Sequence, residues 1–322
     1  MSGFVAGRRA ALRLPAPPLV LVVPAVLVAG AALLPFVYLL IRTTEAGTAV
    51  WSFVTRPRTF GVLGNTLLLA GGVCAASIAI GVPLAWLLER TDLPGRRMVR
   101  ALVAAPLAIP SLVGGYAFVA AFGAGGIVDR WARSAFGTGL PDVYGFPGAW
   151  LVLTLLSYPY VLLPAAAALR SLDPAQEEIA KSLGHGPLRV FFRVILPSLR
   201  PAVRSGGLLA ALYTLSDFSA VSLLQFDSFT RAIYVQYQAS FNRSYAAVLA
   251  LILALLAAAL LAFESAGRRE ERYFRTGSGV KRSAPLVRLG PWRWPAFAGC
   301  GLLILAAVGL PVGVTLYWLI RG

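Results

Sequence analysis

Apolar residues in this chain gather in long runs instead of alternating with polar residues. Seven runs of 18 or more residues are almost free of charged side chains. A helix of about 20 apolar residues crosses the hydrocarbon core of a bilayer, and it satisfies its own backbone hydrogen bonds there. The pattern therefore predicts an all-α fold, a polytopic membrane helical bundle. The predicted spans lie near residues 19–41, 60–88, 101–122, 148–169, 205–225, 244–263 and 295–320.

The third predicted span contains several residues that disturb helices. Pro106 and Pro110 interrupt its first half, and Gly114 and Gly115 follow. Proline removes a backbone donor and kinks or breaks a helix. We therefore expect the third span to be kinked or divided. The glycine-rich segment 123–147 that follows predicts an interfacial loop with one short amphipathic helix.

A polar and basic stretch, which we call the elbow (residues 173–204), separates the fourth and fifth spans. Asp173 is a good N-cap for a first helix, and Gly184 supplies the left-handed residue at which such a helix ends. Pro187 favours the first turn of a second short helix, which we expect Pro197 to close. Leu and Phe residues recur in this second helix at three- and four-residue spacing,. The stretch therefore predicts two short helices joined in a compact elbow with an apolar face.

The elbow also carries a sequence motif, E-x-A-x-x-x-G followed after nine residues by an aliphatic residue, any residue, Leu and Pro. It resembles the cytoplasmic EAA loop of permease subunits in binding-protein-dependent type I ABC importers. Ile179 and Val194 replace the Ala and Ile that the family usually has, and both remain apolar. The resemblance implies a MetI-like permease fold and a loop that docks into a separate ATPase. The implied ATPase-coupling residues are Glu178, Ala180, Gly184, Val194, Leu196 and Pro197.

The formal net charge of +16 is compatible with a nucleic-acid-binding protein as well as with a membrane protein,. The placement of the basic residues decides between these classes. If the N-terminus is cytoplasmic, 21 of the 29 Lys and Arg residues fall in the inner segments, as the positive-inside rule requires. The charge therefore predicts a multi-pass protein of a bacterial or archaeal inner (plasma) membrane, with a cytoplasmic N-terminus and a cytoplasmic elbow. Acidic lipid, and not nucleic acid, is the expected counterpart of this charge.

The spans divide into one large unit and a remainder. We expect a cytoplasmic lead over residues 1–18, a six-span permease unit over 19–263 and a basic cytoplasmic linker over 264–294. The last span, in 295–322, carries Gly-Leu-Pro and Leu-Ile-Arg, which echo Leu-Leu-Pro and Leu-Ile-Arg of the first span at a different spacing. With the linker before it, this span resembles the start of a second permease half, as in the fused permeases of iron(III), thiamine and aminophosphonate importers. We therefore expect the working transporter to need a second permease half besides this six-span unit.

Asp217 is the only acidic residue within the seven predicted spans. A carboxylate at the centre of a bilayer costs roughly 2.5–3.5 kcal/mol on insertion scales, so such residues mark pathways or pair internally. Its context, TLSDFSAVSLLQFDSFTRAIY, resembles the corresponding span of iron(III)-type permeases, which implies a place beside the translocation path. The alternative is an internal hydrogen bond, through Thr214 or Ser216, that locks the span to a neighbour.

Motifs for catalysis or for a resident cofactor are missing from the sequence. It has no G-x-x-x-x-G-K-[ST] phosphate loop, no H-E-x-x-H and no G-x-S-x-G,. The one histidine, His185, and the two separated cysteines do not have the spacing of a metal site,. We therefore expect no enzyme activity, no metal and no cofactor in this chain, with ATP bound by a partner ATPase.

The leading hypothesis is a permease subunit that forms the translocation path of an ABC importer. Its expected partners are two ABC ATPase subunits, a periplasmic substrate-binding protein, a second permease half and membrane lipid. The context of the fifth span favours iron(III) as the substrate, with thiamine, an aminophosphonate or a polyamine as alternatives. An ion-coupled secondary transporter is the rival from another class, but it would need more intramembrane charges than Asp217 or broken helices for its ions. A membrane-embedded hydrolase is a third hypothesis, but the sequence lacks the motifs of such an enzyme.

Reporter fusions test the predicted topology. The positive-inside rule places successive loops on opposite sides of the membrane, so a reporter should give opposite signals in them. A cytoplasmic signal at Ser134 would overturn the span count. The fusions expected to report cytoplasm are at Arg97, Ser182 and Ser278, and those expected to report periplasm are at Thr55, Ser134 and Arg231.

Overall fold

The computed structural model describes residues 19–45, 47, 49–239, 243–268 and 286–321. Regular structure in these residues is helical, apart from one isolated parallel bridge between Thr91 and Val287. The predicted all-α membrane bundle is therefore confirmed. The predicted lead over 1–18 and residues 269–285 of the predicted linker lie outside the described residues.

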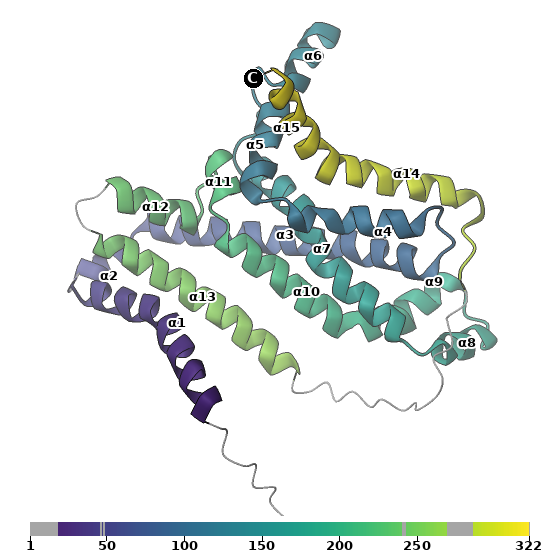
Figure 1. The fold of residues 1–322 in the computed structure, drawn as a ribbon, viewed down its shortest axis with the longest axis horizontal. Coiled ribbons are helices and arrows are strands. Elements are labelled where there is room, and N and C mark those ends of the chain that lie inside the picture. The colour runs from purple at the N-terminus through teal and green to yellow at the C-terminus, as the bar shows by residue number, and fades with distance from the viewer. Residues whose placement is uncertain (1–18, 46, 48, 240–242, 269–285, 322) are drawn as a thin grey trace, which may run out of the picture.

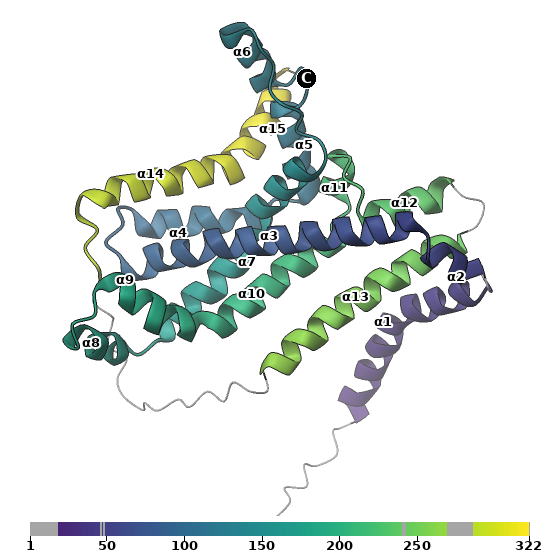
Figure 2. The same ribbon diagram turned by 180° about the vertical axis from the view of Figure 1, so that it is seen from behind.

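Three long helices form the centre of the bundle. They are α3 (Pro57–Arg90), α7 (Phe146–Ser171) and α10 (Leu196–Ser216). Each packs against the other two, and Figures 1 and 2 show them side by side from both directions. Their facing side chains are mostly apolar, so the buried core of the molecule lies between them.

Small residues let these three helices approach closely. A Cβ atom on Gly206 of α10 would lie 2.7 Å from the carbonyl oxygen of Tyr160 and from the Cα of Val161 in α7. A Cβ atom on Gly81 of α3 would lie 3.0 Å from the backbone nitrogen of Leu162 in α7. Because these neighbours are backbone atoms, they cannot rotate away, and a larger residue would push the helices apart.

The third predicted span is divided, as its prolines indicate. Helix α4 (Arg96–Ala104) runs into a short 3-10 turn, η1 (Ala105–Ala108), and α5 (Ser111–Phe122) then turns away from α4 (Figures 1 and 2). The short amphipathic helix expected within 123–147 is α6 (Ile127–Phe136). The prolines explain this division, because each lacks the backbone N–H that a continuous helix uses and its ring clashes with the preceding turn.

The fifth predicted span is also divided, at a place where no proline or glycine marks a break. The backbone at Asp217 is extended, with φ −71° and ψ 125°, and it ends α10. Two shorter helices follow, α11 (Ser219–Leu223) and α12 (Phe229–Ala239). The prediction of one continuous span near 205–225 is therefore wrong in its second half. The physical reason is the hydrogen bond that the Asp217 side chain makes to α11, described below.

Helix α1 (Leu19–Glu45) lies at the edge of the molecule. It contacts the rest of the bundle mainly through α13 (Ser244–Arg268), and α2 (Ala49–Val54) connects it to α3 (Figures 1 and 2). Its most apolar stretch has no buried residue in the described chain. A helix with apolar side chains on all sides has to be covered by lipid or by another protein.

The last predicted span folds back onto this bundle. A 3-10 turn, η3 (Gly290–Trp292), leads into α14 (Arg293–Ile304), a π-helical turn, η4 (Leu305–Gly309), and α15 (Leu310–Arg321). Helix α14 packs against α4, and α15 packs against α5. We call α14, η4 and α15 the C-terminal helix pair.

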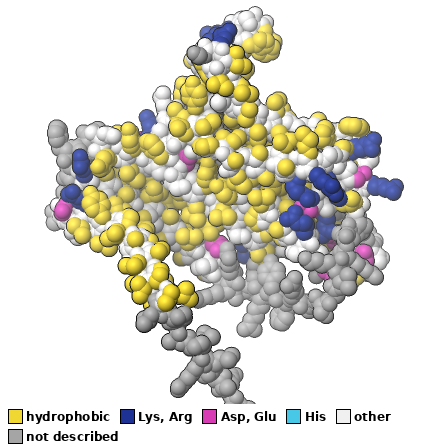
Figure 3. Space-filling model, viewed as in Figure 1, with side chains coloured by type: hydrophobic (Ala, Val, Ile, Leu, Met, Phe, Trp, Pro, Cys, Tyr) yellow, Lys and Arg dark blue, Asp and Glu magenta, His cyan; other side chains and the backbone are white. Residues whose placement is uncertain are grey.

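Six helical stretches of the described chain are long and apolar enough to cross a membrane. The fifth predicted span, whose first part is α10, is not among them, because the first half of α10 contains Arg200 and Arg204 and is less apolar. It nevertheless packs against both α3 and α7 in the core. Figure 3 shows a broad apolar surface over the middle of the molecule and a group of Lys and Arg side chains at the end where α4 and the elbow lie.

Replacing Gly206 by alanine should weaken the packing of α10 on α7. Overpacking a close-packed interior costs about 1–3 kcal/mol, so we expect a lower free energy of unfolding and a lower melting temperature in detergent. Gly71 of α3 is the matched control, because a Cβ atom there would have no heavy atom within 4 Å. Gly71→Ala should leave the melting temperature unchanged or raise it. Equal melting temperatures of the two variants would contradict this account of the core.

Candidate functional site

The elbow begins with a helix whose two ends are fixed by its own residues. Before α8 (Pro174–Ser182), the carboxylate of Asp173 accepts a hydrogen bond of 3.0 Å from a backbone N–H two residues on. After it, Gly184 has a φ of +78°, and the N–H of His185 donates to the carbonyl of Ala180 at 3.2 Å. This is the pattern of a helix that ends at a left-handed residue. The predicted N-cap and the predicted glycine stop are therefore confirmed.

The second half of the elbow is one continuous helical run that enters the bundle. Helix α9 (Pro187–Val190) continues through a π-helical turn, η2 (Phe191–Ile195), into α10. Pro197 lies in the first turn of α10, and the N–H of Leu196 before it bonds to the carbonyl of Phe191, five residues back. The wider π turn changes the hydrogen-bond register, so that the proline ring and its missing N–H are tolerated. The prediction that Pro197 closes the second helix is therefore wrong.

The inner face of the elbow belongs to the core of the bundle. Ala180 of α8, Val190 of α9 and Ile195 of η2 are buried, and they join the apolar cluster formed with α3 and α7. Phe191 packs edge-on against Trp86 of α3, with ring centroids 5.9 Å apart. The elbow is thus attached to the membrane helices by apolar contacts of both its halves.

The outer face of the elbow exposes large apolar side chains. Ile179 is 60% exposed, Leu183 is 71% exposed and Phe192 is 60% exposed. Leu183 follows the last residue of α8, and its N–H donates to the carbonyl of Ile179 at 3.1 Å, so these two side chains, four residues apart, are neighbours,. Apolar side chains placed on the surface of a polar helix are typical of a docking face. The sequence analysis did not select Leu183 or Phe192 as site residues. Large apolar residues among the polar residues of the elbow would have indicated them.

The six residues of the motif all lie in the elbow, in different settings. Glu178 is exposed on α8, Ala180 is buried beneath it, and Gly184 forms the turn. The remaining three are partly buried at the junction of η2 and α10: Val194, Leu196 and Pro197. All six residues thus lie in the elbow, and their role in coupling to an ATPase stays a prediction.

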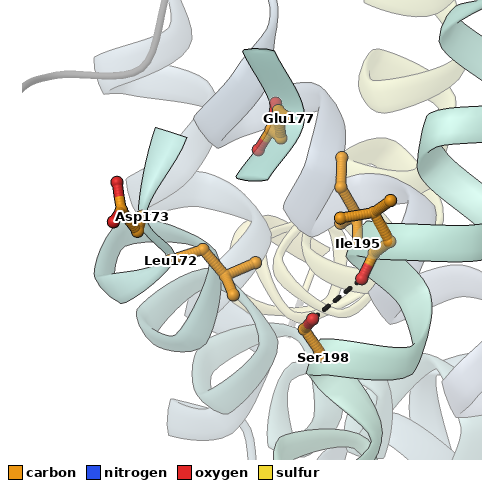
Figure 4. A pocket seen from close by; sticks show the side chains of 6 residues that line it. Leu172, Asp173, Glu177, Ile195 and Ser198 are labelled. Carbon is orange, nitrogen blue, oxygen red and sulfur yellow. Dashed lines mark hydrogen bonds between the residues drawn. The ribbon is translucent and has the colours of Figure 1, made fainter. Parts of the chain in front are cut away.

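A shallow crevice lies on the inner side of the elbow, between α8 and the start of α10 (Figure 4). Figure 4 shows Glu177 across this crevice from Ile195 and Ser198. Its carboxylate is buried and forms an ion pair with Arg90, the last residue of α3, with Nη2 2.9 Å from Oε1. The residues that line the crevice are Leu172, Asp173, Glu177, Val194, Ile195 and Ser198.

Glu177 was missed by the sequence analysis. It precedes the motif residue Glu178, and successive residues of a helix point about 100° apart, so two adjacent carboxylates indicate one inward and one outward side chain. The basic residue Arg90 at the end of an apolar span was the second available signal. Nothing local in the sequence indicates that these two residues meet.

Asp217, the predicted path residue, lies in the break between α10 and α11. Its buried carboxylate accepts a hydrogen bond of 2.9 Å from the N–H of Ala220, and its carbonyl accepts one of 2.7 Å from the hydroxyl of Thr230. Thr214 and Ser216, the partners suggested by the sequence, instead donate to carbonyls of their own helix. The carboxylate thus has an internal structural role, and its place beside a translocation path stays a prediction.

The described residues do not assemble a metal site. In the described ranges, no three His, Cys, Asp or Glu side chains come close enough together to hold an ion. His185 lies half-buried in the turn of the elbow. The expectation that this chain has no resident cofactor stays a prediction.

Comparison with known proteins identifies the family. The sequence matches the model of the "binding-protein-dependent transport system inner membrane component" over residues 77–266. This range begins within α3 and includes α7, the whole elbow, α10 and nearly all of α13. It is more than half of the chain, so the match does not rest on the elbow motif alone.

Two curated relatives carry names of transport proteins. The chain is 33% identical over 308 residues to the Fe(3+)-transport system permease protein FbpB 2 of Haemophilus influenzae, which covers 95% of this chain and 57% of that protein. It is 32% identical over 170 residues to the molybdenum transport system permease protein ModB of Mycobacterium bovis, which covers 53% of this chain and 63% of that protein. The chain thus spans less than two thirds of the length of these relatives.

Solved structures show the same fold at low identity. One chain of the bacterial alginate ABC transporter, in complex with an alginate pentasaccharide-bound periplasmic protein, aligns with a TM-score of 0.60 and 17% identity, over 77% of this chain and 94% of that one. This likeness confirms the predicted type I ABC importer permease fold. Together, the fold and the family model show that this chain belongs to the family of inner membrane components of binding-protein-dependent transport systems.

Proposed function

We propose that this protein forms the translocation path of an ABC importer, that it receives substrate from a periplasmic binding protein and that it couples through the elbow to a separate ATPase. The elbow is the observation that carries the proposal. It exposes Ile179, Leu183 and Phe192, while the buried residues Ala180 and Ile195 anchor it in the bundle core. A docking face that is firmly attached to membrane helices is what ATP-driven coupling requires.

The continuity of the elbow with α10 supports a mechanical role. The helical run from α9 through η2 into α10 has no loop, so a displacement of the elbow moves the start of α10 with it. Helix α10 packs against both α3 and α7, with Gly206 against the backbone of α7. Closely packed helices move as rigid bodies and do not deform continuously. We infer that closure of the ATPase subunits rotates these helices together and so alternates access to the path.

Iron(III) is the substrate that we propose. Two observations support it: the sequence around Asp217, which resembles the corresponding span of iron(III)-type permeases, and the 33% identity to a relative named for Fe(3+) transport. A relative of similar identity is named for molybdenum transport. The choice among oxyanions, iron(III) and organic substrates therefore rests on the binding protein that delivers the ligand.

We also propose that a second permease unit completes the path. The echo between the first span and residues 295–322 makes α1 and the C-terminal helix pair equivalent elements of two units. The C-terminal helix pair packs against α4 and α5 of this unit, whereas the most apolar stretch of α1 is uncovered. By this equivalence, α1 lies against the corresponding surface of the second unit. The second unit also supplies a second elbow, so that each of two ATPase subunits has one.

Gly184→Val tests the coupling role of the elbow. A residue with a Cβ atom at a φ of +78° is strained by about 1–3 kcal/mol,, while no neighbour lies within 4 Å of the added Cβ. We expect the variant to insert into the membrane at normal levels but to lose at least about tenfold of its ATP-driven transport, because couplings between sites correspond to ~5–150-fold changes. The measurement is uptake per inserted transporter.

Gly137→Val is the matched control for this test. Gly137 also has a positive φ, +72°, and open space around its Cβ position, but it ends α6, away from the elbow. It should show a similar strain and near-normal coupling. Normal uptake by a well-expressed Gly184→Val variant would refute the coupling role.

Reconstitution in proteoliposomes tests the substrate and the second unit. With the ATPase, the second permease unit and the binding protein encoded with them, iron(III)-loaded binding protein should stimulate ATP hydrolysis and iron uptake, and molybdate should do neither. Omission of the second permease unit should abolish both. Stimulation by molybdate alone would replace the proposed substrate, whereas full stimulation without any second unit would refute the proposal that two units are needed.

A further inference from the structure

The C-terminal end of α3 joins several elements that are far apart in the sequence. Figures 1 and 2 show that this end of α3, the elbow and the segment leading into α14 lie at the same end of the molecule. The first residue that makes such contacts is Glu89, whose side chain is 6% exposed. Its carboxylate pairs with Arg100 of α4 at 3.1 Å and with Arg170 of α7 at 2.8 Å. These two ion pairs hold α3, α4 and α7 together at this end.

Arg90, the next residue, connects α3 to the elbow. Its Nη2 lies 2.9 Å from Oε1 of Glu177 in α8 and donates a hydrogen bond of 3.0 Å to the carbonyl of Leu169 in α7. The side chains of Arg90 and Glu177 are only 5% and 10% exposed. A buried charge without a partner is strongly unfavourable, so each of these two residues depends on the other.

The segment before α14 is attached at the same place. The N–H of Val287 donates to the carbonyl of Arg90 at 2.8 Å, and the N–H of Leu289 donates to the carboxylate of Asp92 at 2.8 Å. The N–H of Asp92 in turn donates to the carbonyl of Val287 at 3.3 Å. Four consecutive residues, 89–92, therefore contact α4, α7, α8 and the segment that precedes the C-terminal helix pair.

We propose that the Arg90–Glu177 ion pair transmits movement of the elbow to α3, with Glu177 as a positioning residue for coupling. This inference rests on the proposed coupling function of the elbow. Helix α8 packs mainly against α9 and η2, which lead into α10. The ion pair adds a direct tie from α8 to a second core helix, so that α3 and α10 follow the elbow together.

The chemistry of the Arg90–Glu177 ion pair suits a contact between two elements that move together. Coulomb attraction depends on distance more than on angle, so the pair keeps α8 attached to α3 through small changes in the angle between them. Among the described residues, the buried Nε of Arg90 and Oε1 of Glu177 have no hydrogen-bond partner, so the contact is an ion pair without a fixed hydrogen-bond geometry. The bond from Arg90 to Leu169 keeps the guanidinium in place on the core side.

Glu177→Gln in the assembled transporter, with its ATPase, binding protein and second permease unit, tests the proposal. The variant keeps the size of the side chain and removes its charge. We expect the ATPase subunits to stay bound and basal ATP hydrolysis to persist, while stimulation by the loaded binding protein and transport fall at least about tenfold. Wild-type stimulation in a normally assembled Glu177→Gln variant would overturn the proposal.

A double variant separates transmission from a role in stability alone, and it decides the question if Glu177→Gln does not assemble. Arg90→Met combined with Glu177→Leu removes both buried charges, and such replacements are often neutral or stabilising. We expect normal thermal stability together with the same loss of stimulation. If the double variant transports at the wild-type rate, the ion pair serves stability only and the proposal is wrong.

Arg100→Gln is the matched control within the same cluster. Arg100 is half-exposed, and its partner Glu89 keeps Arg170, so stimulation should stay within about twofold of wild type,. A tenfold loss in this control would show that any charge removed from the cluster uncouples the transporter, which contradicts a specific role of Glu177. Normal transport by both Glu178→Ala and Gly184→Val would instead refute the coupling function of the elbow itself.

Discussion

A bilayer offers no hydrogen-bond partners to an exposed backbone, and this constraint explains how the helices of this protein break and restart. At Asp217 the helix stops, and the carboxylate bonds to the first turn of α11. The elbow, which we expect outside the bilayer, follows the same rule: before Pro197 the helix widens into a π turn, and the N–H of Leu196 bonds to the carbonyl of Phe191. Between α4 and α5 the backbone tightens into a 3-10 turn at Pro106. Each departure from the α-helix is thus accompanied by a local replacement for the lost bond.

The close approach of α3, α7 and α10 limits how the molecule can move. Because Gly206 and Gly81 lie against backbone atoms of α7, the core leaves no space in which one helix could bend independently,. The elbow is attached to two of these helices, to α10 by a continuous run and to α3 by the Arg90–Glu177 pair. A force applied to the elbow is therefore shared by α3 and α10, which also contact each other. This arrangement favours rigid-body rotation over local deformation.

The parts of the elbow that follow local rules could be predicted from the sequence. Asp173 and Gly184 act on backbone groups a few residues away, so their identity is enough to place the ends of α8. Pro197 was misjudged because its effect depends on the hydrogen-bond register of the preceding turn, which the sequence does not display. The break at Asp217 was missed for a similar reason: an aspartate in an apolar run does not reveal whether it bonds to a neighbouring helix or to its own backbone.

The two adjacent carboxylates of α8 differ in a way that only the tertiary structure reveals. The motif singles out Glu178, which is exposed, while Glu177 beside it is buried against Arg90 of a distant helix. Because successive helical residues point about 100° apart, neighbouring positions can serve opposite sides of one short helix. An exposed charge costs little free energy and can contact a partner protein. A buried charge is tolerated only when another group of the fold pairs with it. Helix α8 therefore has one carboxylate available to a partner and one committed to the membrane helices, as the proposed coupling role requires.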